Sequence, residues 1–369
     1  MSEETTVNSL ALKYRPRQLD ELVGQKNVVD TFTQASINNR FAQTYIFTGS
    51  RGCGKTTTAR IVANLLTCKD VKGGKVCGKC RACEVVPSGL AMDVIELDGA
   101  KNRNVDHMEN LIEGAQWQPT EFDRKVLIID ESHQLSDKAI SSLLKITEEP
   151  PSYLTFIFCT TEAHKMLPTI ISRSQRFNFR KITSKEMLSR LRFIADAEKI
   201  KVSDAALFSI AKISRGCLRD AIVPLDQVST LMGDKEITDE IVQKYFCIPD
   251  RQAIFLMVKS MVTGNISLLM DQVNDLIMAS ADIEAIAFEV SDIFRSMMIL
   301  KAQGEARLLD IPDHEIEELK KLAEPVKLGQ LDKLSRLFSS IKKEITYSIN
   351  ERWILESTLI HCAAVLRKL

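Results

Sequence analysis

The sequence has no net charge and no long apolar run. Its 49 basic and 49 acidic side chains cancel, so the strongly basic composition of many nucleic-acid-binding proteins is missing, and nucleic acid could be bound only by a local patch. No stretch reaches the roughly 20 apolar residues of a membrane-spanning helix. The N-terminal MSEETTVNS is polar and acidic and lacks the pattern of a signal peptide. We therefore expect a cytoplasmic protein that makes no membrane contact.

Enough apolar residues are present for packed cores. Of the residues, 45% are hydrophobic, and the length of 369 residues favours two or three folded domains. Continuous apolar runs, typical of buried strands, occur at 43–47, 93–98, 125–130 and 154–160. They alternate with helical patterns, which predicts a parallel α/β sheet. After about Lys181 helical periodicity dominates, with helices expected at 183–198, 204–215, 219–232, 254–261 and 331–345, and domain boundaries near 182 and 248.

A phosphate-binding loop follows the first apolar run. The pattern G-x-x-x-x-G-K-[ST] is complete and is made by Gly49, Ser50, Arg51, Gly52, Cys53, Gly54, Lys55 and Thr56. Glycines let backbone N–H groups surround phosphate oxygens, and the following helix adds a favourable dipole. We expect ATP here, with Lys55 at its β- and γ-phosphates and the Thr56 hydroxyl on magnesium. The alternative is a glycine-rich turn that matches by chance.

An acidic pair ends the apolar run 125–130. Asp130 is placed to hold magnesium, and Glu131 is placed to polarise an attacking water molecule. By itself, such a run could also be a strand that ends in a solvated turn. Behind a phosphate loop, the pair favours nucleotide hydrolysis.

Four cysteines lie close together in a short basic segment. Cys68, Cys77, Cys80 and Cys83 have the spacing C-x8-C-x2-C-x2-C, and four thiolates can close a tetrahedral zinc site. Free thiols on a loop, or a redox pair, are the alternatives. A loop this rich in cysteine favours structural zinc, with no open coordination position for chemistry.

Several motifs together resemble those of AAA+ clamp loaders. Asp130-Glu131-Ser132-His133 is similar to their DExH-type box, and the other matches are Thr160-Thr161 (sensor 1), 171–177 (the Ser-Arg-Cys motif) and 216–221 (sensor 2). The chain resembles the bacterial DNA polymerase III gamma/tau subunits from Lys13 to its helical end. It departs from their pattern at Ser174, usually Cys, and at Ser132, usually Val. Both neighbour the expected catalytic groups, so only local packing is put in doubt.

The resemblance implies roles for further residues. Arg173 would be an arginine finger that serves the ATP of a neighbouring subunit, where a guanidinium offsets charge on the γ-phosphate. Arg219 would contact the nucleotide of its own chain from the second domain. Thr161 would sense the γ-phosphate or the water. The adenine would lie near the N-terminal segment Tyr14, Arg15 and Pro16. An ordinary surface charge is the alternative for each arginine.

The fold implied by the resemblance has three parts. They are an α/β AAA+ P-loop ATPase domain (1–182) with a zinc module (68–83), a small helical lid domain (183–248) and an all-α collar domain for oligomerisation (249–369). The implied protein is an ATP-hydrolysing motor subunit of the clamp loader in the DNA-directed DNA polymerase III holoenzyme, which loads the sliding clamp on primed DNA. ATP, Mg²⁺ and Zn²⁺ would be its cofactors. Its partners would be delta and delta-prime type subunits, further copies of itself in a ring, the clamp and primer–template DNA.

Other functions are possible on the same residues. A Holliday-junction or replication-restart AAA+ motor is disfavoured by the cysteine segment and the Ser-Arg motif. A delta-prime type scaffold without hydrolysis is disfavoured by the intact phosphate loop. Lys101 and Arg103 are candidates for contacts with DNA phosphates. Because the chain stops at Leu369, we interpret it as the shorter, gamma-type form or a truncated longer one.

Overall fold

The computed structural model describes residues 9–101, 105–302, 309, 311 and 313–367. The chain forms two compact units, one ending at Ile237 and one beginning at Thr238. Each unit has its own buried apolar core. The division into three domains near 182 and 248 stays a prediction. Among the described helices, none combines the length and apolar character needed to cross a bilayer.

A parallel sheet forms the centre of the first unit. Its described strands are β1 (Thr44–Gly49), β2 (Val94–Asp98), β3 (Lys125–Asp130), β4 (Leu154–Thr160) and β5 (Gln175–Phe179), in the spatial order β2-β3-β4-β1-β5. β1, β3 and β4 are buried almost throughout, which explains their continuous apolar sequences. The four predicted strands are confirmed. The apolar pattern does not predict β5, an edge strand in which an exposed Asn178 separates two buried phenylalanines.

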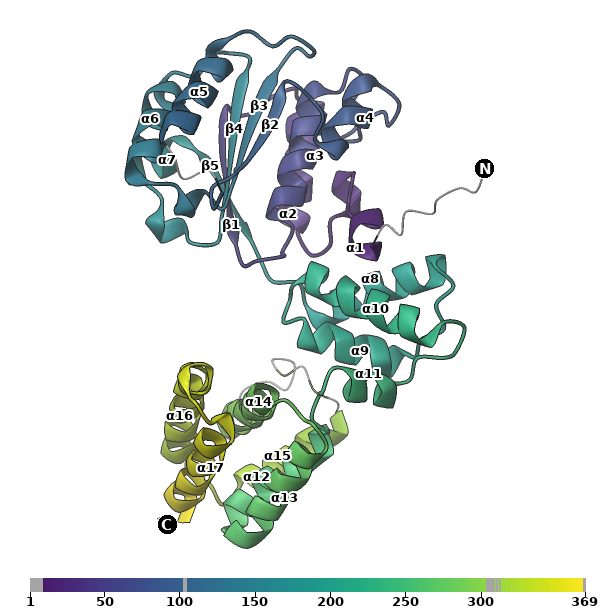
Figure 1. Ribbon diagram of the computed structural model, residues 1–369, viewed down its shortest axis with the longest axis vertical. Coiled ribbons are helices and arrows are strands. Elements are labelled where there is room, and N and C mark those ends of the chain that lie inside the picture. The colour runs from purple at the N-terminus through teal and green to yellow at the C-terminus, as the bar shows by residue number, and fades with distance from the viewer. Residues whose placement is uncertain (1–8, 102–104, 303–308, 310, 312, 368–369) are drawn as a thin grey trace. The chain divides into compact units, whose positions relative to one another are not determined.

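Helices cover both faces of this sheet (Figure 1). α2 (Lys26–Ile37), α3 (Lys55–Thr67) and α4 (Arg81–Ser88) pack on one face, and α5 (Val105–Gln116), α6 (Asp137–Glu148) and α7 (Pro168–Arg173) pack on the other. On the first face, the ring of Phe32 stacks on that of Phe177 with centroids 4.9 Å apart. On the second, Leu143 is buried with Phe156. Because all paired strands are parallel, their carboxyl ends meet at one edge, where such folds bind ligands.

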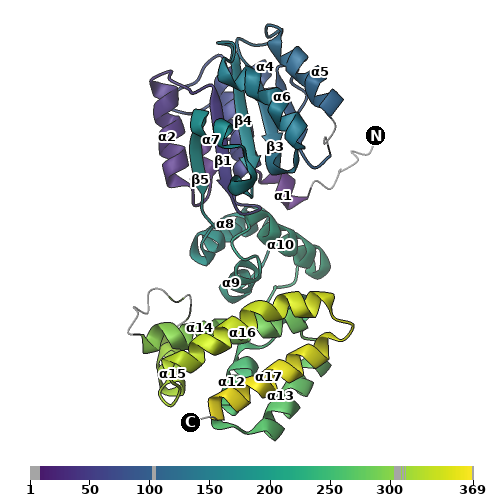
Figure 2. The same ribbon diagram turned by 90° about the vertical axis from the view of Figure 1, so that its left-hand side faces the viewer.

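Three further helices complete the first unit. They are α8 (Ser184–Ala197), α9 (Asp204–Ile213) and α10 (Leu218–Met232), and β5 leads directly into α8 (Figure 2). Thr183 and Ser203 cap the first two. The bounds of the three helices confirm the predicted ones to within a few residues. The short helix α1 (Leu10–Lys13) is tied to α10, because the Leu10 N–H donates to Asp226 at 3.0 Å. Single 3₁₀ turns occur at η1 (Leu19–Glu21), η2 (Ser132–Gln134) and η3 (Ala163–Lys165).

The described part of the second unit is entirely helical. Its helices are α11 (Asp239–Tyr245), α12 (Arg251–Thr263), α13 (Ile266–Met278), α14 (Ile283–Lys301), α15 (Asp313–Ala323), α16 (Leu328–Tyr347) and α17 (Glu351–Arg367). The predicted helices 254–261 and 331–345 lie within α12 and α16. An ion cluster joins three of these helices, since the Arg251 guanidinium lies 2.7 Å from carboxylate oxygens of both Glu289 and Glu315.

Candidate nucleotide-binding site and metal centre

The predicted phosphate loop joins β1 to α3. Gly52 has a φ of 71°, which favours glycine, and a Cβ there would lie 1.8 Å from Sγ of Cys217. Lys55 is buried at the start of α3. Its ammonium donates to the carbonyl oxygens of Gly49 and Ser50, both at 2.9 Å. The loop therefore surrounds a buried cation, as a phosphate site requires.

Thr56 and Asp130 meet at the edge of the sheet. The Thr56 hydroxyl donates to Oδ2 of Asp130 at 2.6 Å, and Oδ1 accepts the backbone N–H of Glu131 at 2.9 Å. Hydroxyl and carboxylate oxygens are the ligands that magnesium prefers. The two predicted magnesium ligands, 74 positions apart in the sequence, are thus adjacent.

Glu131 sits in a tight turn directly after β3. Its backbone is left-handed, with a φ of 46°. The turn packs against Gly99, where a Cβ would lie 2.7 Å from the Glu131 carbonyl oxygen, and the Gly99 N–H donates to the Asp130 carbonyl at 2.8 Å. The carboxylate of Glu131 lies beside the end of β4, with the Thr161 hydroxyl 3.5 Å from Oε2.

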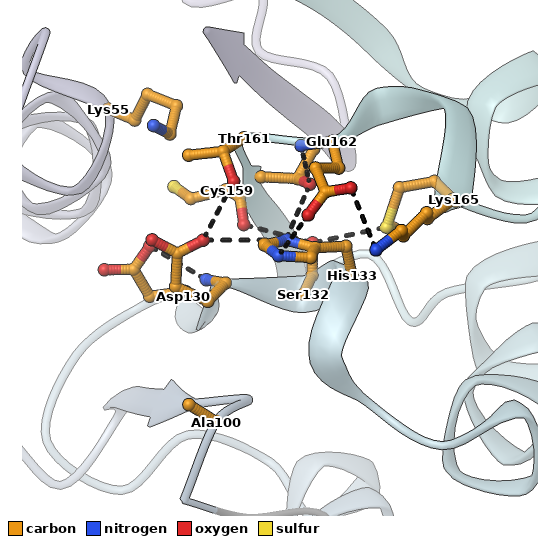
Figure 3. A network of polar contacts seen from close by, with 12 residues as sticks. Lys55, Ala100, Asp130, Ser132, His133, Cys159, Thr161, Glu162 and Lys165 are labelled. Carbon is orange, nitrogen blue, oxygen red and sulfur yellow. Dashed lines mark hydrogen bonds and ion pairs between the residues drawn. The ribbon is translucent and has the colours of Figure 1, made fainter. Parts of the chain in front are cut away.

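A histidine whose side chain is only 6% exposed also contacts this carboxylate (Figure 3). His133 has Nδ1 3.5 Å from Oε2 of Glu131 and 3.1 Å from Oγ1 of Thr160. Its Nε2 lies 3.4 Å from Oε1 of Glu162. The sequence motif contains His133 but gives no role to it, and no motif indicates Glu162. The available signal is that polar residues follow both β3 and β4, whose carboxyl ends are neighbours in the sheet.

A cavity of about 660 Å³ opens beside the phosphate loop. This size is typical of small-molecule sites. The predicted site residues that line it are Tyr14, Arg15, Pro16, Arg51, Gly52, Cys53, Gly54, Lys55, Thr56, Asp130, Glu131 and Arg219. Of the residues predicted to contact or sense the nucleotide, Gly49, Ser50, Thr161 and Arg173 are not in this lining. The loop, the acidic pair, the N-terminal segment and α10 thus converge on one space.

The N-terminal segment contacts both α3 and α8. Nε of Arg15 donates to Oγ1 of Thr57 at 3.2 Å, and burial, with the nearby charge of Arg60, lowers the pKa of Arg15 to about 10. The Tyr14 hydroxyl donates to Glu198. Burial, and then this hydrogen bond, raise the pKa of Tyr14 to about 12. The segment is part of the cavity wall, and its contact with adenine stays a prediction.

The two predicted arginines have different surroundings. Arg219, in the first turn of α10, lines the cavity of its own chain. Arg173, the last residue of α7, pairs with Glu148 of α6 at 2.5 Å, and its side chain is 44% exposed. Arg173 is therefore accessible and lies outside the cavity lining.

The two departures from the family pattern are accommodated locally. The buried Ser132 hydroxyl donates to the Cys159 carbonyl at 3.1 Å. The Ser174 hydroxyl donates to the Ile170 carbonyl at 2.6 Å. Neither serine therefore leaves its hydroxyl without a partner.

The four clustered cysteines fit a tetrahedral metal site. Their Sγ atoms all lie within 4.8 Å of one another, and the close pairs are 3.6–3.9 Å apart. A zinc ion with four Zn–S bonds of about 2.3 Å requires sulfur atoms about 3.8 Å apart. Burial opposes ionisation of Cys80, but hydrogen bonds from the backbone of Cys83 and Lys69 outweigh it and lower the pKa of Cys80 to about 6. The sulfur geometry supports the predicted zinc ligands.

The predicted DNA contacts are only partly described. Lys101 is exposed in a turn after β2, where its N–H donates to the Asp98 carbonyl at 3.1 Å. Arg103 lies outside the described residues. Contact of either side chain with DNA stays a prediction.

The fold and the cavity define the class of protein. A parallel sheet in the order given above, with a phosphate loop after β1 and an acidic pair after β3, is an AAA+ P-loop fold. A solved structure of the Thermotoga maritima RuvB P216G mutant matches with a TM-score of 0.50 and 23% identity, covering 66% of this chain and 80% of that one. This likeness concerns the fold alone.

Sequence relatives identify the family. Residues 24–183 match the family described as DNA polymerase III, delta subunit, and residues 237–368 match domain III of DNA polymerase III subunits gamma and tau. The Bacillus subtilis DNA polymerase III subunit tau is 32% identical over 94% of the chain, and the Mycoplasma genitalium subunit gamma/tau is 39% identical over 69%. The chain belongs to the DNA polymerase III gamma/tau subunit family. It spans 62% and 42% of the lengths of these two relatives.

Proposed function

We propose that this chain is the ATPase motor subunit of a DNA polymerase III clamp loader. It would use ATP binding and hydrolysis to load the sliding clamp on primed DNA. The observation that carries the proposal is the convergence of Lys55, Thr56, Asp130 and Glu131 on one cavity, in a chain of the gamma/tau family. A scaffold subunit without hydrolysis would have no need of all four groups.

Each group has a distinct part in this proposal. The Lys55 ammonium contacts the β- and γ-phosphates, and Thr56 and Asp130 hold magnesium, which would offset phosphate charge when bound. Glu131 accepts a hydrogen bond from the attacking water and orients it. Thr161, beside Glu131, senses the γ-phosphate or the water. Arg219 contacts the nucleotide from α10.

Other parts of the chain supply assembly in this proposal. The second unit, which is helical in its described part, is the collar that joins delta and delta-prime type subunits and further copies of this chain into a ring. In such a ring Arg173 would serve the ATP of a neighbouring subunit, and its exposure outside the cavity of its own chain supports this role. The cysteine cluster holds a structural zinc ion. The loader acts on the clamp and primer–template DNA in the cytoplasm.

A steady-state ATPase assay tests the proposal. The full chain is assembled with partner subunits, clamp and primed DNA, and hydrolysis is compared with that of Glu131→Gln. We expect the variant to bind ATP normally and to lose turnover by about 10²–10⁴-fold, because only water activation is removed. Glu113→Gln, on the exposed side of α5, is the matched control and should behave as the wild type. Normal turnover by Glu131→Gln would show that another group activates the water.

A further inference from the structure

Polar contacts link Glu131, which lines the cavity, to His133 and Glu162 (Figure 3). His133 is at the centre of these contacts, and only 6% of its side chain is exposed. Its Nδ1 lies 3.5 Å from Glu131 and 3.1 Å from the Thr160 hydroxyl, while Nε2 lies 3.4 Å from Glu162. One buried imidazole thus contacts two carboxylates, one at the cavity and one near the surface.

Glu162 is fixed from two directions. Its backbone N–H donates to Oγ1 of Thr160 at 3.0 Å, and its Oε2 accepts from the Lys165 ammonium at 2.9 Å. The Lys165 hydrogen bond lowers the pKa of Glu162, so its carboxylate stays charged. Glu162 therefore offers His133 a charged acceptor that is paired with Lys165, and Thr160 contacts the ring on the Nδ1 side.

Of the three residues whose polar contacts with His133 are described above, Glu131 alone lines the cavity. The cavity lining includes Glu131, but it does not include His133, Thr160 or Glu162. A change in the ring would therefore alter the carboxylate of Glu131 and leave the described nucleotide-site contacts of Lys55 intact.

We propose that His133 is a positioning residue that holds the carboxylate of Glu131 in the orientation needed to activate water. The inference rests on the proposed ATPase function. Both described contacts of this carboxylate, from His133 and Thr161, fall on Oε2, which leaves Oε1 to accept a hydrogen bond from water. A free glutamate side chain samples many rotamers, and catalysis by proton transfer depends on the geometry of the acceptor.

Substitutions of the ring test this assignment in the assembled loader. We expect His133→Ala to lower kcat by about 10- to 100-fold, a part of the 10²–10⁴-fold that a positioned acid or base contributes. KM and the ATP dissociation constant should not change. His133→Asn should retain more activity than His133→Ala, because its amide nitrogen can replace Nδ1. It should not restore the full rate, because the amide cannot also reach Glu162. Glu162→Gln should give a smaller loss in kcat alone.

A double substitution separates positioning from a general structural role. If His133 acts through Glu131, adding His133→Ala to Glu131→Gln should cause no further loss in single-turnover hydrolysis. His164→Asn is the matched control, because His164 lies 3.7 Å from Glu162 but is 76% exposed and has no described contact with Glu131. It should hydrolyse ATP at the wild-type rate.

The outcomes distinguish this inference from the proposed function. A wild-type loader that hydrolyses no ATP contradicts the proposed function itself. If the wild type is active, a His133→Ala enzyme with normal kcat overturns the positioning role. The positioning role is also overturned if adding His133→Ala lowers the hydrolysis rate of the Glu131→Gln enzyme further. Should His133→Ala fail to fold, the surface variant Glu162→Gln decides the matter, and an unchanged kcat in that folded variant overturns the inference.

Discussion

The nucleotide cavity and the cysteine cluster lie in the same unit but are held together differently. Around the cavity, the fold supplies a hydrogen-bond partner for each central side chain: Lys55 donates to loop carbonyls, and Thr56 donates to Asp130. In the cluster, four thiols face one another, and thiols are weak hydrogen-bonding groups. The cavity is therefore held by hydrogen bonds within the protein, whereas the cluster, as a proposed zinc site, would be held by an ion.

Lys55→Ala is the strongest test of this difference. The loop loses its buried cation, so we expect hydrolysis to be abolished and ATP binding to weaken at least about tenfold, as for a lost charge-assisted hydrogen bond. Zinc content and the far-ultraviolet circular dichroism spectrum should not change. Lys185→Ala, at an exposed position of α8, is the control. ATP binding equal to that of the control would mean that the cavity does not use Lys55 for phosphate.

Arg173→Ala tests whether hydrolysis in one cavity requires an arginine from a neighbouring subunit. ATP binding by the isolated subunit should not change, because Arg173 is outside the cavity lining. In the assembled loader, hydrolysis should fall by roughly 10³–10⁵-fold, the range of arginine fingers in related phosphoryl transfers. Single-turnover hydrolysis is measured in rings in which every copy of this chain but one carries Lys55→Ala, so that one copy alone can bind ATP. A loss that follows the subunit carrying Arg173→Ala, and not its neighbour, contradicts action across the interface.

Cys80→Ser should have the smallest effect on nucleotide chemistry. We expect one zinc ion per wild-type chain and substantially less in the variant, since four ligands are needed to close the site. The segment 68–83 should become sensitive to protease, while the sheet keeps its own core and binds ATP. Cys247→Ser, a cysteine of the second unit outside the cluster, is the control. Metal analysis that finds no zinc in fresh, reduced wild-type protein rejects the site.

The parts of the fold that the sequence predicts are those with strong periodicity or a motif. β1, the phosphate loop and α3 follow from a buried run and a complete consensus. The helix α4 begins at the end of the cysteine segment and continues past it, and Pro87 and the ligand spacing obscure its helical periodicity. β5 is missed because it is a polar edge strand. In each case the local signal is weak, and tertiary packing decides the structure.

The candidate site likewise contains residues that the sequence predicts and contacts that it does not. Lys55, Thr56, Asp130 and Glu131 could be predicted from motifs because each lies next to a recognisable strand or helix end. The contact between His133 and Glu162 could not, because it depends on the pairing of two strands. β3 and β4 pair with Ile129 opposite Phe158, and this register brings the residues after both strands together.

The left-handed backbone of Glu131 has an evolutionary consequence. A residue with a side chain in this conformation destabilises the fold by about 1–2 kcal/mol, and glycine or asparagine would avoid much of that cost. Selection for stability alone would therefore remove the glutamate. If Glu131 activates water as proposed, turnover has been favoured over stability at this position. Searches for more thermostable variants of this chain should be expected to find substitutions here that are stable and inactive.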